Sequence, residues 1–439
     1  MMLKRTSRIT CSAAVAALLI GLAGCGDNNG SDTSDSPGTD QASQPVALRM
    51  TVWTGNEDHL SLFNSIADEY VAANGDKVSS VTFETLPYDE YTQTLTTQIS
   101  GGNAPDLAWI LEASGPEFVA SGILSDLKPA LESAEGYNLD EVLDSALALW
   151  QKDGSIYAYP FSNSPFGVLV NTTMLTEAGQ PLPKDLIASG DWTWDKLRQI
   201  SAAAVAATGK GGFYLSGFES YLAWQFMAEA WDSWDAAPWS ADGTTCTFTD
   251  KPMVDFMTWY HDAVYVDNAI PQPGVVSDFY AGEAAMVTAQ ISRAAGLDGS
   301  FEWDIVPLPE GPAGLHPVIG QAGIGVLAQG ANPAAAADFL AFFTNPANSA
   351  KLAQYFPPPR ESLLNTDVLG AANPLLTAEQ LQAVVIDQMP DAVTLPSHVV
   401  FAEVSDAARI VLDDLWTAQA DVPSVMANIC EAIDPLLGN

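Results

Sequence analysis

The chain has 439 residues, with 16 Lys and Arg against 54 Asp and Glu, for a formal net charge of −38. A surface this acidic repels nucleic acid and anionic lipid, which argues against a nucleic-acid partner. Residues 45–439 are too many for one ordinary hydrophobic core and suit two domains.

The N-terminus has the pattern of a secretion signal. Basic residues among the first eight precede an apolar stretch at about 13–22, which is short for a bilayer-spanning helix. The stretch ends in Leu22-Ala23-Gly24-Cys25, which resembles the lipobox of bacterial lipoproteins. We expect residues 1–24 to be a signal peptide and Cys25 to be the lipidated N-terminus. An ordinary signal peptide with an incidental cysteine is the alternative.

The segment after Cys25 is predicted to be a tether. Residues 26–44 are almost wholly Gly, Asp, Asn, Ser, Thr, Gln and Pro, so they cannot bury enough apolar surface to offset their ordering entropy. We expect 25–44 to be a lipidated, disordered segment with a mean reach of about 24 Å. No later apolar run approaches the length of a membrane span, so the lipid is the predicted anchor of a soluble body.

Two cysteines remain in the body of the protein, Cys246 and Cys430. An extracytoplasmic compartment permits oxidation, and we favour a disulfide between them, with two separate buried thiols as the alternative. The four histidines are scattered, and no His or Cys cluster has metal-ligand spacing. The sequence therefore predicts no metal ion and no cofactor.

Strand and helix patterns alternate along the first part of the body. Strands are expected at 46–53, 78–83 and 106–111, and helices at 57–73 and 88–100. This alternation predicts βαβ units and a mainly parallel sheet.

Further elements continue the α/β pattern. They are expected as strands at 166–171, 284–288 and 318–327, and as helices at 174–178, from 193, at 221–230 and at 252–266. Most of the last hundred residues have a helical pattern that prolines interrupt.

Five segments, in this order, carry a family resemblance. They are GGNAPDLAW at 101–109, IYAYPF at 156–161 running on to 171, WTWDKL at 192–197, FYAGEAAM at 279–286, and the segment 333–360 with its Pro-rich end. Together they resemble the family 1 extracellular solute-binding proteins, which include the maltose- and maltodextrin-binding proteins of ABC importers. Lys196 departs from the acid usual in that family.

The resemblance implies a two-lobed, periplasmic-binding-protein-like α/β fold (type II), with a ligand cleft between lobes joined by hinge crossings. We expect lobe 1 to comprise 45–162 plus 287–344, and lobe 2 to comprise 163–286 plus 345–439. In such proteins the ligand stabilises the closed state by touching both lobes.

The resemblance also implies a function outside the cell. We expect a monomeric lipoprotein on the outer face of the bacterial cell membrane that captures a sugar or short oligosaccharide. It would deliver this carbohydrate to the transmembrane subunits of an ABC permease, without enzymatic activity.

A sugar site needs aromatic rings for apolar C–H faces and polar side chains for hydroxyls. Open α/β sheets bind ligands beyond the carboxyl ends of their strands. After the first strand the candidates are Trp53, Asn56, Glu57 and Asp58, although a helix N-terminus also favours acids. After the third strand they are Trp109 and Glu112, where resembling maltodextrin binders place a ring and an acid against sugar.

The remaining candidates follow from the resemblance. They are Asn163, Ser164 and Phe166 at the first crossing, Glu219, Tyr221 and Trp224 in the second lobe, and Gln290, Arg293, His398, Phe401 and Glu403 near later crossings. Ser164 stands where the family has a carboxylate, which leaves the identity of the sugar open.

Three alternatives remain. A glycoside hydrolase also combines acids and aromatics in a cleft. The same fold could bind another small solute. Iron requires several Tyr or His ligands and phosphate requires clustered Arg residues or helix N-termini, and the sequence shows neither cluster. A polyamine would be suited by the acids Glu57, Asp58, Glu112 and Glu219. A surface adhesin would bind no small ligand.

Overall fold

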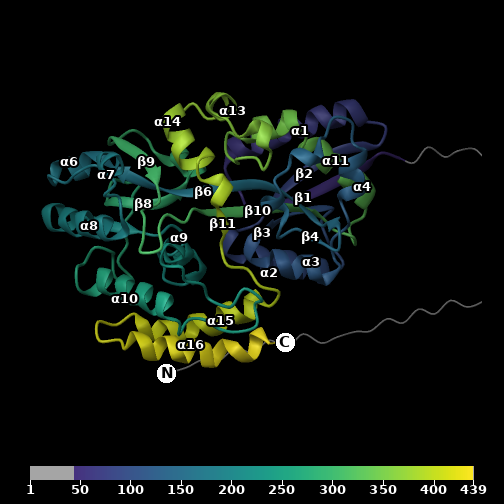
Figure 1. The fold of residues 1–439 in the computed structure, drawn as a ribbon. Helices are drawn as coiled ribbons and strands as arrows, with labels where there is room; N and C mark the ends of the chain where they lie inside the picture. The colour runs from purple at the N-terminus through teal and green to yellow at the C-terminus, as the bar shows by residue number, and fades with distance from the viewer. Residues whose placement is uncertain (1–43, 439) are drawn as a thin grey trace, which may run out of the picture. The chain divides into compact units, whose positions relative to one another are not determined.

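The structure is a computed structural model that describes residues 44–438 (Figure 1). The predicted signal peptide, Cys25 with its lipidation, and residues 26–43 of the predicted tether lie outside the described residues. Within 44–438, no helix is both long enough and apolar enough to span a membrane.

A mixed sheet of nine strands organises the described part. Its order is β2-β1-β3-β10-β6-β8-β7, with β9 paired to β6 and β11 paired to β10. The strands are β1 (Val46–Val52), β2 (Val78–Thr85), β3 (Leu107–Leu111), β6 (Ala158–Asn171), β7 (Gly211–Tyr214), β8 (Ala284–Gln290), β9 (Trp303–Pro307), β10 (Val318–Val326) and β11 (Val393–Thr394). A separate hairpin joins β4 (Gln151–Lys152) and β5 (Ser155–Ile156).

The expected parallel pairing holds at the ends of the sheet and is wrong at its centre. β1 runs parallel to β2 and β3, and β7 runs parallel to β8. In contrast, β10 is antiparallel to β3 and β6, and β6 is antiparallel to β8 and β9. The centre is antiparallel because the chain passes through it once in each direction, outward along β6 and back along β10.

The two central strands belong to two hydrophobic cores. All 14 residues of β6 are buried. Residues 158–161 pack with the core around Trp109, and residues 166–170 pack with the cores on the far side. β10 divides likewise, since Ala322 packs with the Trp109 core and Val318 with the other side. Two lobes therefore share β6 and β10, as Figure 1 shows; the first lobe holds β1, β2 and β3, and the second holds β7, β8 and β9.

Helices cover each half of the sheet. Those packed with the first lobe are α1 (Glu57–Asn74), α2 (Tyr91–Ser100), α3 (Gly115–Ser121), α4 (Lys128–Ser133), α5 (Asp144–Leu147), α11 (Pro333–Phe343) and α12 (Pro346–Leu352). Those packed with the second are α6 (Thr172–Glu177), α7 (Pro183–Ser189), α8 (Trp194–Thr208), α9 (Ala228–Trp231), α10 (Lys251–Tyr265), α13 (Thr366–Ala372), α14 (Ala378–Leu381), α15 (Phe401–Leu412) and α16 (Val422–Leu437).

The lobe boundaries remain a proposal, and the cores support a shift from the expected ones. Residues 287–307, expected in lobe 1, comprise the end of β8, the connection that follows it, and β9, and they pack with second-lobe residues. Leu352, expected in lobe 2, packs with the first-lobe core. We propose that the third crossing lies near 353–361, where the Asn163 N–H donates to the Pro357 carbonyl at 3.0 Å.

The helix α1 shows how local sequence positions the site. The Asn56 side chain caps it, because its Oδ1 accepts the N–H groups of Asp58 at 2.8 Å and His59 at 3.3 Å. One face buries Phe63 and Tyr70, seven residues apart. The cap therefore leaves four connecting residues, 53–56, between β1 and α1, and these residues line the cavity described below.

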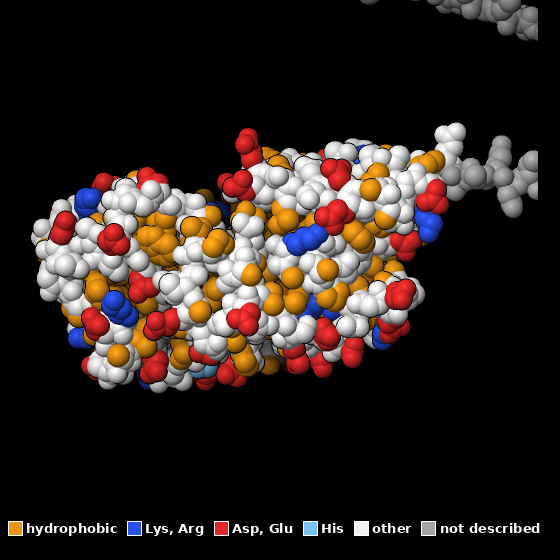
Figure 2. Space-filling view, turned by 90° about the horizontal axis from the view of Figure 1, so that it is seen from above, with side chains coloured by type: hydrophobic (Ala, Val, Ile, Leu, Met, Phe, Trp, Pro, Cys, Tyr) orange, Lys and Arg blue, Asp and Glu red, His pale blue; other side chains and the backbone are white. Residues whose placement is uncertain are grey.

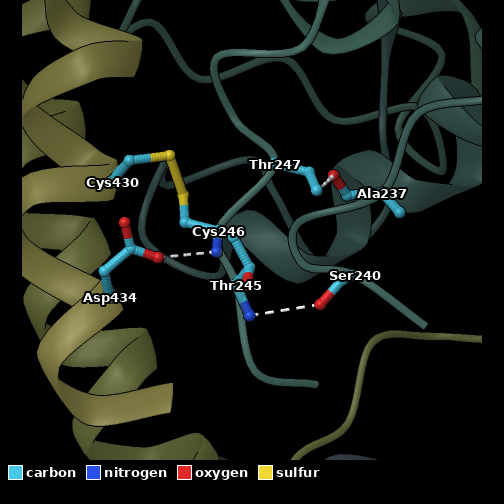
Figure 3. Close-up of a disulfide and its surroundings, with 7 residues drawn as sticks. All are labelled: Ala237, Ser240, Thr245, Cys246, Thr247, Cys430 and Asp434. Atoms are coloured by element: carbon cyan, nitrogen blue, oxygen red, sulfur yellow. Dashed lines mark hydrogen bonds between the residues drawn. A yellow bond between two sulfur atoms is a disulfide. The ribbon is translucent and has the colours of Figure 1, made fainter. Parts of the chain in front are cut away.

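Cys246 and Cys430 form a disulfide, which is the pairing that we favoured from the sequence (Figure 3). The bond links the loop before α10 to α16. Beside it, the Cys246 N–H donates to Asp434 Oδ1 at 2.7 Å. Segments 184 residues apart in the chain are thus joined on the second lobe.

Candidate functional site

A cavity of about 600 Å³ lies where β6 and β10 pass between the lobes. One wall comes from the residues that follow β1, β2 and β3, and the other from those that follow β7 and β8. The lining includes Trp53, Tyr88 and Glu112 from the first lobe and Ser216, Tyr280 and Arg293 from the second.

Aromatic rings form the wall of the first lobe. The ring centroids of Trp53 and Trp109 lie 4.6 Å apart, and those of Trp53 and Tyr88 lie 6.1 Å apart, both pairs edge to face. Trp109 is only 1% exposed and packs at 4.8 Å against Phe161, whereas Tyr88 is 47% exposed. Trp53 and Tyr88 therefore offer ring surface to the cavity, and the buried Trp109 packs against Trp53.

Glu112 is the acid on this wall. It follows β3 directly, in the short 3₁₀ helix Glu112–Ser114, and is 7% exposed. Burial raises the pKa of its carboxyl to about 7, and the backbone N–H groups of Glu112 and Gln321 partly oppose that shift. Near neutral pH the Glu112 carboxyl group is therefore protonated in part of the molecules and ionised in the rest, so it can donate or accept a hydrogen bond.

The cavity floor rests on a buried amide network. Gln321 Oε1 accepts the Trp150 indole N–H at 2.7 Å, and Gln321 Nε2 donates to Asn163 Oδ1 at 2.6 Å. The Asn163 amide in turn donates to the Pro160 carbonyl at 2.9 Å. Asn163 is fully buried, so it supports Gln321, which does line the cavity.

The crossing strands bring Ser164 and Gln290 together. Gln290 Nε2 donates to the Ser164 carbonyl at 3.4 Å, and the buried Ser164 Oγ has no hydrogen-bond partner. A ligand hydroxyl could supply that partner. The missing side chain of Gly320 leaves the space for the Gln290 amide, since a Cβ there would lie 2.2 Å from Gln290 Nε2.

The second-lobe wall is more polar. The Ser216 N–H donates to Thr288 Oγ1 at 2.7 Å, which fixes the loop after β7. Gly217 in that loop has φ +84° and lies against the Phe226 ring. Tyr280 lies between charged neighbours: burial raises its pKa to about 12, Arg293 lowers it, and Glu219 raises it. Arg293 itself is exposed to the cavity.

The structure brings some of the predicted site residues to the cavity. Those that line it are Trp53, Asn56, Trp109, Glu112, Ser164, Phe166, Gln290 and Arg293. Glu219 lies close by, within electrostatic reach of Tyr280. Asn163 lies beneath the floor.

Several other predicted residues lie elsewhere. Glu57 and Asp58 are exposed in the first turn of α1. Trp224 is fully buried in the second-lobe core beside Phe401, and its indole N–H donates to the Ser405 carbonyl at 3.2 Å. The Tyr221 hydroxyl donates to the Pro271 carbonyl. These rings pack as core because segments distant in the chain converge on them, as Phe401 does on Trp224 and Trp416 on Tyr221.

Two further candidates are near the end of the chain. The His398 Nε2 atom lies 3.0 Å from the Gly243 carbonyl, and its ring packs against Trp239. Glu403 is exposed on α15. Neither residue is among those that line the cavity, although Leu395 just before them is.

Sequence reasoning missed several lining residues. The main ones are Tyr88, Ser216, Gly217, Tyr280, Ser292 and Gln321. A signal existed for Tyr88, which follows the carboxyl end of β2 as Trp53 follows β1. Tyr280 lay inside the FYAGEAAM segment. Ser216 and Gly217 follow β7, a four-residue strand that the sequence pattern did not reveal.

A two-lobed α/β body with a cavity between its lobes is the architecture of a solute-binding protein. The family described as bacterial extracellular solute-binding protein matches residues 65–378. The chain belongs to this family, which confirms the resemblance seen in its sequence.

Comparison with individual proteins agrees with this assignment. A putative binding protein of Brucella abortus is 26% identical over 294 residues, covering 62% of this chain. The match spans 66% of the length of that relative.

Solved structures show the same fold. An ABC substrate-binding protein of Listeria monocytogenes, in complex with cycloalternan, superposes with a TM-score of 0.77 at 19% identity, covering 90% of this chain and 99% of that one. A Mycobacterium tuberculosis protein in complex with glycerophosphocholine gives a TM-score of 0.73 at 21% identity, covering 90% and 98%. The fold thus accommodates different ligands, and the cavity residues must decide which one binds here.

Proposed function

We propose that this protein captures a sugar or short oligosaccharide between its lobes and delivers it to the transmembrane subunits of an ABC importer. The observation that carries the proposal is the cavity of about 600 Å³ with open rings on one wall and hydrogen-bonding groups on the other. The rings of Trp53 and Tyr88 suit the C–H faces of a pyranose. Gln290, Ser164 and Glu112 suit its hydroxyls.

Capture would proceed by hinge closure. The lobes are connected through β6, β10 and the segment near 353–361, so a ligand that touches both walls stabilises the closed arrangement by its differential contacts. The proposal includes a lipid at Cys25, which would hold the protein at the outer face of the membrane as a monomer. The lipobox-like sequence ending at Cys25 supports this part.

The cavity favours a sugar over a polyamine. Of the acids that would suit a polyamine, Glu112 lines the cavity, while Glu57 and Asp58 lie on the first turn of α1 and Glu219 lies near the cavity without lining it. Arg293 also lines the cavity, and its charge repels a cation. A polyamine would meet one partly protonated acid and one guanidinium, which is an unfavourable site.

The lining also favours binding over hydrolysis. A glycoside hydrolase places two carboxyl groups on opposite sides of the scissile bond, about 5–9.5 Å apart. Among the residues that line the cavity in the described part of the chain, Glu112 is the one carboxyl group. We therefore propose that the protein releases its bound sugar without hydrolysing it.

Thermal-shift and calorimetric titration of the mature protein against sugars, polyamines and metal ions tests the proposal. A ligand that binds only the folded state raises the melting temperature, by an amount set by its concentration relative to Kd. We expect carbohydrate alone to produce a shift. A shift with polyamines and none with any carbohydrate would refute the assignment, and cleavage of a bound oligosaccharide would refute the non-enzymatic role.

A further inference from the structure

The charge of the cavity differs from that of the protein around it. The chain carries a formal net charge of −38, and Figure 2 shows acidic side chains scattered over one face of the described part with few basic ones. Within the cavity lining, the side chains that can carry charge near neutral pH are His59, Glu112 and Arg293. The local charge therefore depends on the state of these three groups.

Two of the three are wholly or partly neutral near pH 7. Burial lowers the pKa of His59 to about 4, with Asp58 opposing the shift, and its ring packs at 4.2 Å from Tyr355. Glu112 titrates near pH 7 because it is buried. The Arg293 guanidinium stays charged at every physiological pH. Among the described residues that line the cavity, Arg293 is thus the one side chain that is fully charged near neutral pH, inside a strongly acidic protein.

Arg293 also differs from the other arginines of the described chain. Arg49 and Arg198 pair with Glu84 and Asp267, and Arg409 lies 3.9 Å from Asp406. The buried Arg360 donates to three backbone carbonyls. For Arg293, which lines the cavity and is exposed, residues 44–438 provide no ion pair within 4.0 Å and no hydrogen bond, so its donors are available to a ligand.

The surroundings of Arg293 come from both lobes. Burial raises the pKa of Tyr280 from the second lobe and the Arg293 charge opposes that shift, while Tyr88 from the first lobe is also within electrostatic reach of Arg293. Both phenols are protonated near neutral pH, as ordinary tyrosines are, and can donate hydrogen bonds. An anionic group beside Arg293 would lie among three donors drawn from the two sides of the cleft.

We infer that the ligand is an acidic sugar, whose single carboxylate or phosphate group is received by Arg293 while its ring lies against Trp53 and Tyr88. This inference rests on the proposed function and narrows it. A guanidinium binds a carboxylate or phosphate through two parallel, charge-assisted hydrogen bonds, which are about twice as strong as neutral ones. It binds a hydroxyl through neutral-acceptor bonds, so a neutral sugar would leave much of this donor set unused.

Calorimetric titration with matched pairs tests the inference. The two members of each pair differ by one acidic group: glucose with glucuronate, glucose with glucose phosphate, and galactose with galacturonate. We expect at least one acidic member to bind about tenfold or more tighter than its neutral partner, because the extra bonds are charge-assisted. The carboxylate and phosphate arms identify which acid the site takes.

Variants of Arg293 test whether its charge causes the preference for the acidic sugar of each pair. Arg293→Gln should remove the preference for the acidic member, and Arg293→Lys should retain part of it because the charge stays. Arg409→Gln is the matched control, since it removes an arginine from α15 that does not line the cavity, and the preference should persist. Melting temperatures verify that each variant is folded. The comparison of acidic with neutral sugars on the wild-type protein does not depend on any variant.

The possible results separate the two proposals. Equal or tighter binding of the neutral member in every pair would overturn the acidic-sugar inference and leave sugar binding intact. A preference that survives in Arg293→Gln would overturn the role of Arg293. Absence of binding by every sugar, neutral or acidic, would overturn the proposed function and the inference with it.

Discussion

Gly320 of β10 and Gln290 of β8 approach so closely that a methyl group at residue 320 would lie 2.2 Å from the Gln290 amide nitrogen. Both residues line the cavity, and Gln290 also reaches the Ser164 carbonyl at 3.4 Å. Because Gly320 of β10 has no side chain, the Gln290 amide of the second lobe has room for its position at the cavity.

Gly320→Ala should accordingly displace the Gln290 side chain and weaken ligand binding. We expect a loss of roughly 1–3 kcal/mol, because a polar group that bonds the ligand would lose its geometry. Gly370→Ala is a suitable control, since the nearest atom to a Cβ there is 3.8 Å away and residue 370 lies in a helix, where alanine is favoured. Calorimetric affinities that are equal for the two variants would contradict this role of Gly320.

The two tryptophans of the first-lobe wall should respond differently to truncation. Trp53 is only half-buried, so Trp53→Ala should weaken sugar binding by about 1–2 kcal/mol and cost little stability. Trp109 is 1% exposed, so Trp109→Ala should lower the free energy of unfolding by about 3–5 kcal/mol, the cost of a large cavity in a core.

Urea unfolding and calorimetry on both variants measure the two effects separately. If Trp109→Ala instead reduced affinity while leaving the urea midpoint unchanged, Trp109 and not Trp53 would be the stacking ring. The sequence alone proposed both rings for contact, because it could not show that Trp109 is buried behind Trp53.

The local sequence pattern was sufficient to predict those residues of the candidate site that follow strands of the βαβ units. Periodicity placed the first and third strands, and the rule that ligands bind beyond strand ends then pointed to Trp53 and Glu112. The same rule would have added Tyr88 had it been applied to β2. What the pattern could not predict was the antiparallel centre, since strand direction depends on how the chain crosses between lobes.

Residues assigned to the cleft by resemblance were predicted less well than those assigned by strand ends. Trp224 and Tyr221 have the residue types of a sugar site, yet their rings pack against Phe401 and Trp416, which lie more than 170 positions later in the chain. Contacts of that range leave no periodicity in a single sequence. Composition therefore cannot separate a stacking ring from a core ring.

The disulfide between Cys246 and Cys430 should stabilise the second lobe without affecting the ligand. Replacing both cysteines by alanine should cost about 2–5 kcal/mol of unfolding free energy, the usual range for a native disulfide. Neither residue lines the cavity, so the calorimetric Kd should stay within about twofold of wild type. A large loss of affinity in a variant that is still folded at the assay temperature would show that the bond also sets the lobe geometry.

Glu112 should make stability depend on pH in a direction opposite to that of most surface acids. Its pKa is about 7 in the folded protein against 4.5 when exposed, so folding takes up a proton between these values and stability falls as pH rises through them. A shift of that size corresponds to about 3 kcal/mol. Glu112→Gln keeps the shape and stays neutral, so it should match wild type near pH 4, below the unfolded pKa, and be more stable near pH 8.5. Other buried acids such as Glu229 also titrate, and for this reason the difference between variant and wild type is the quantity to measure by urea unfolding. Glu361→Gln, which removes an exposed carboxyl group outside the cavity, is the matched control for the loss of one acid. A pH-independent difference for Glu112→Gln would mean that its carboxyl is ionised in the folded protein throughout this range.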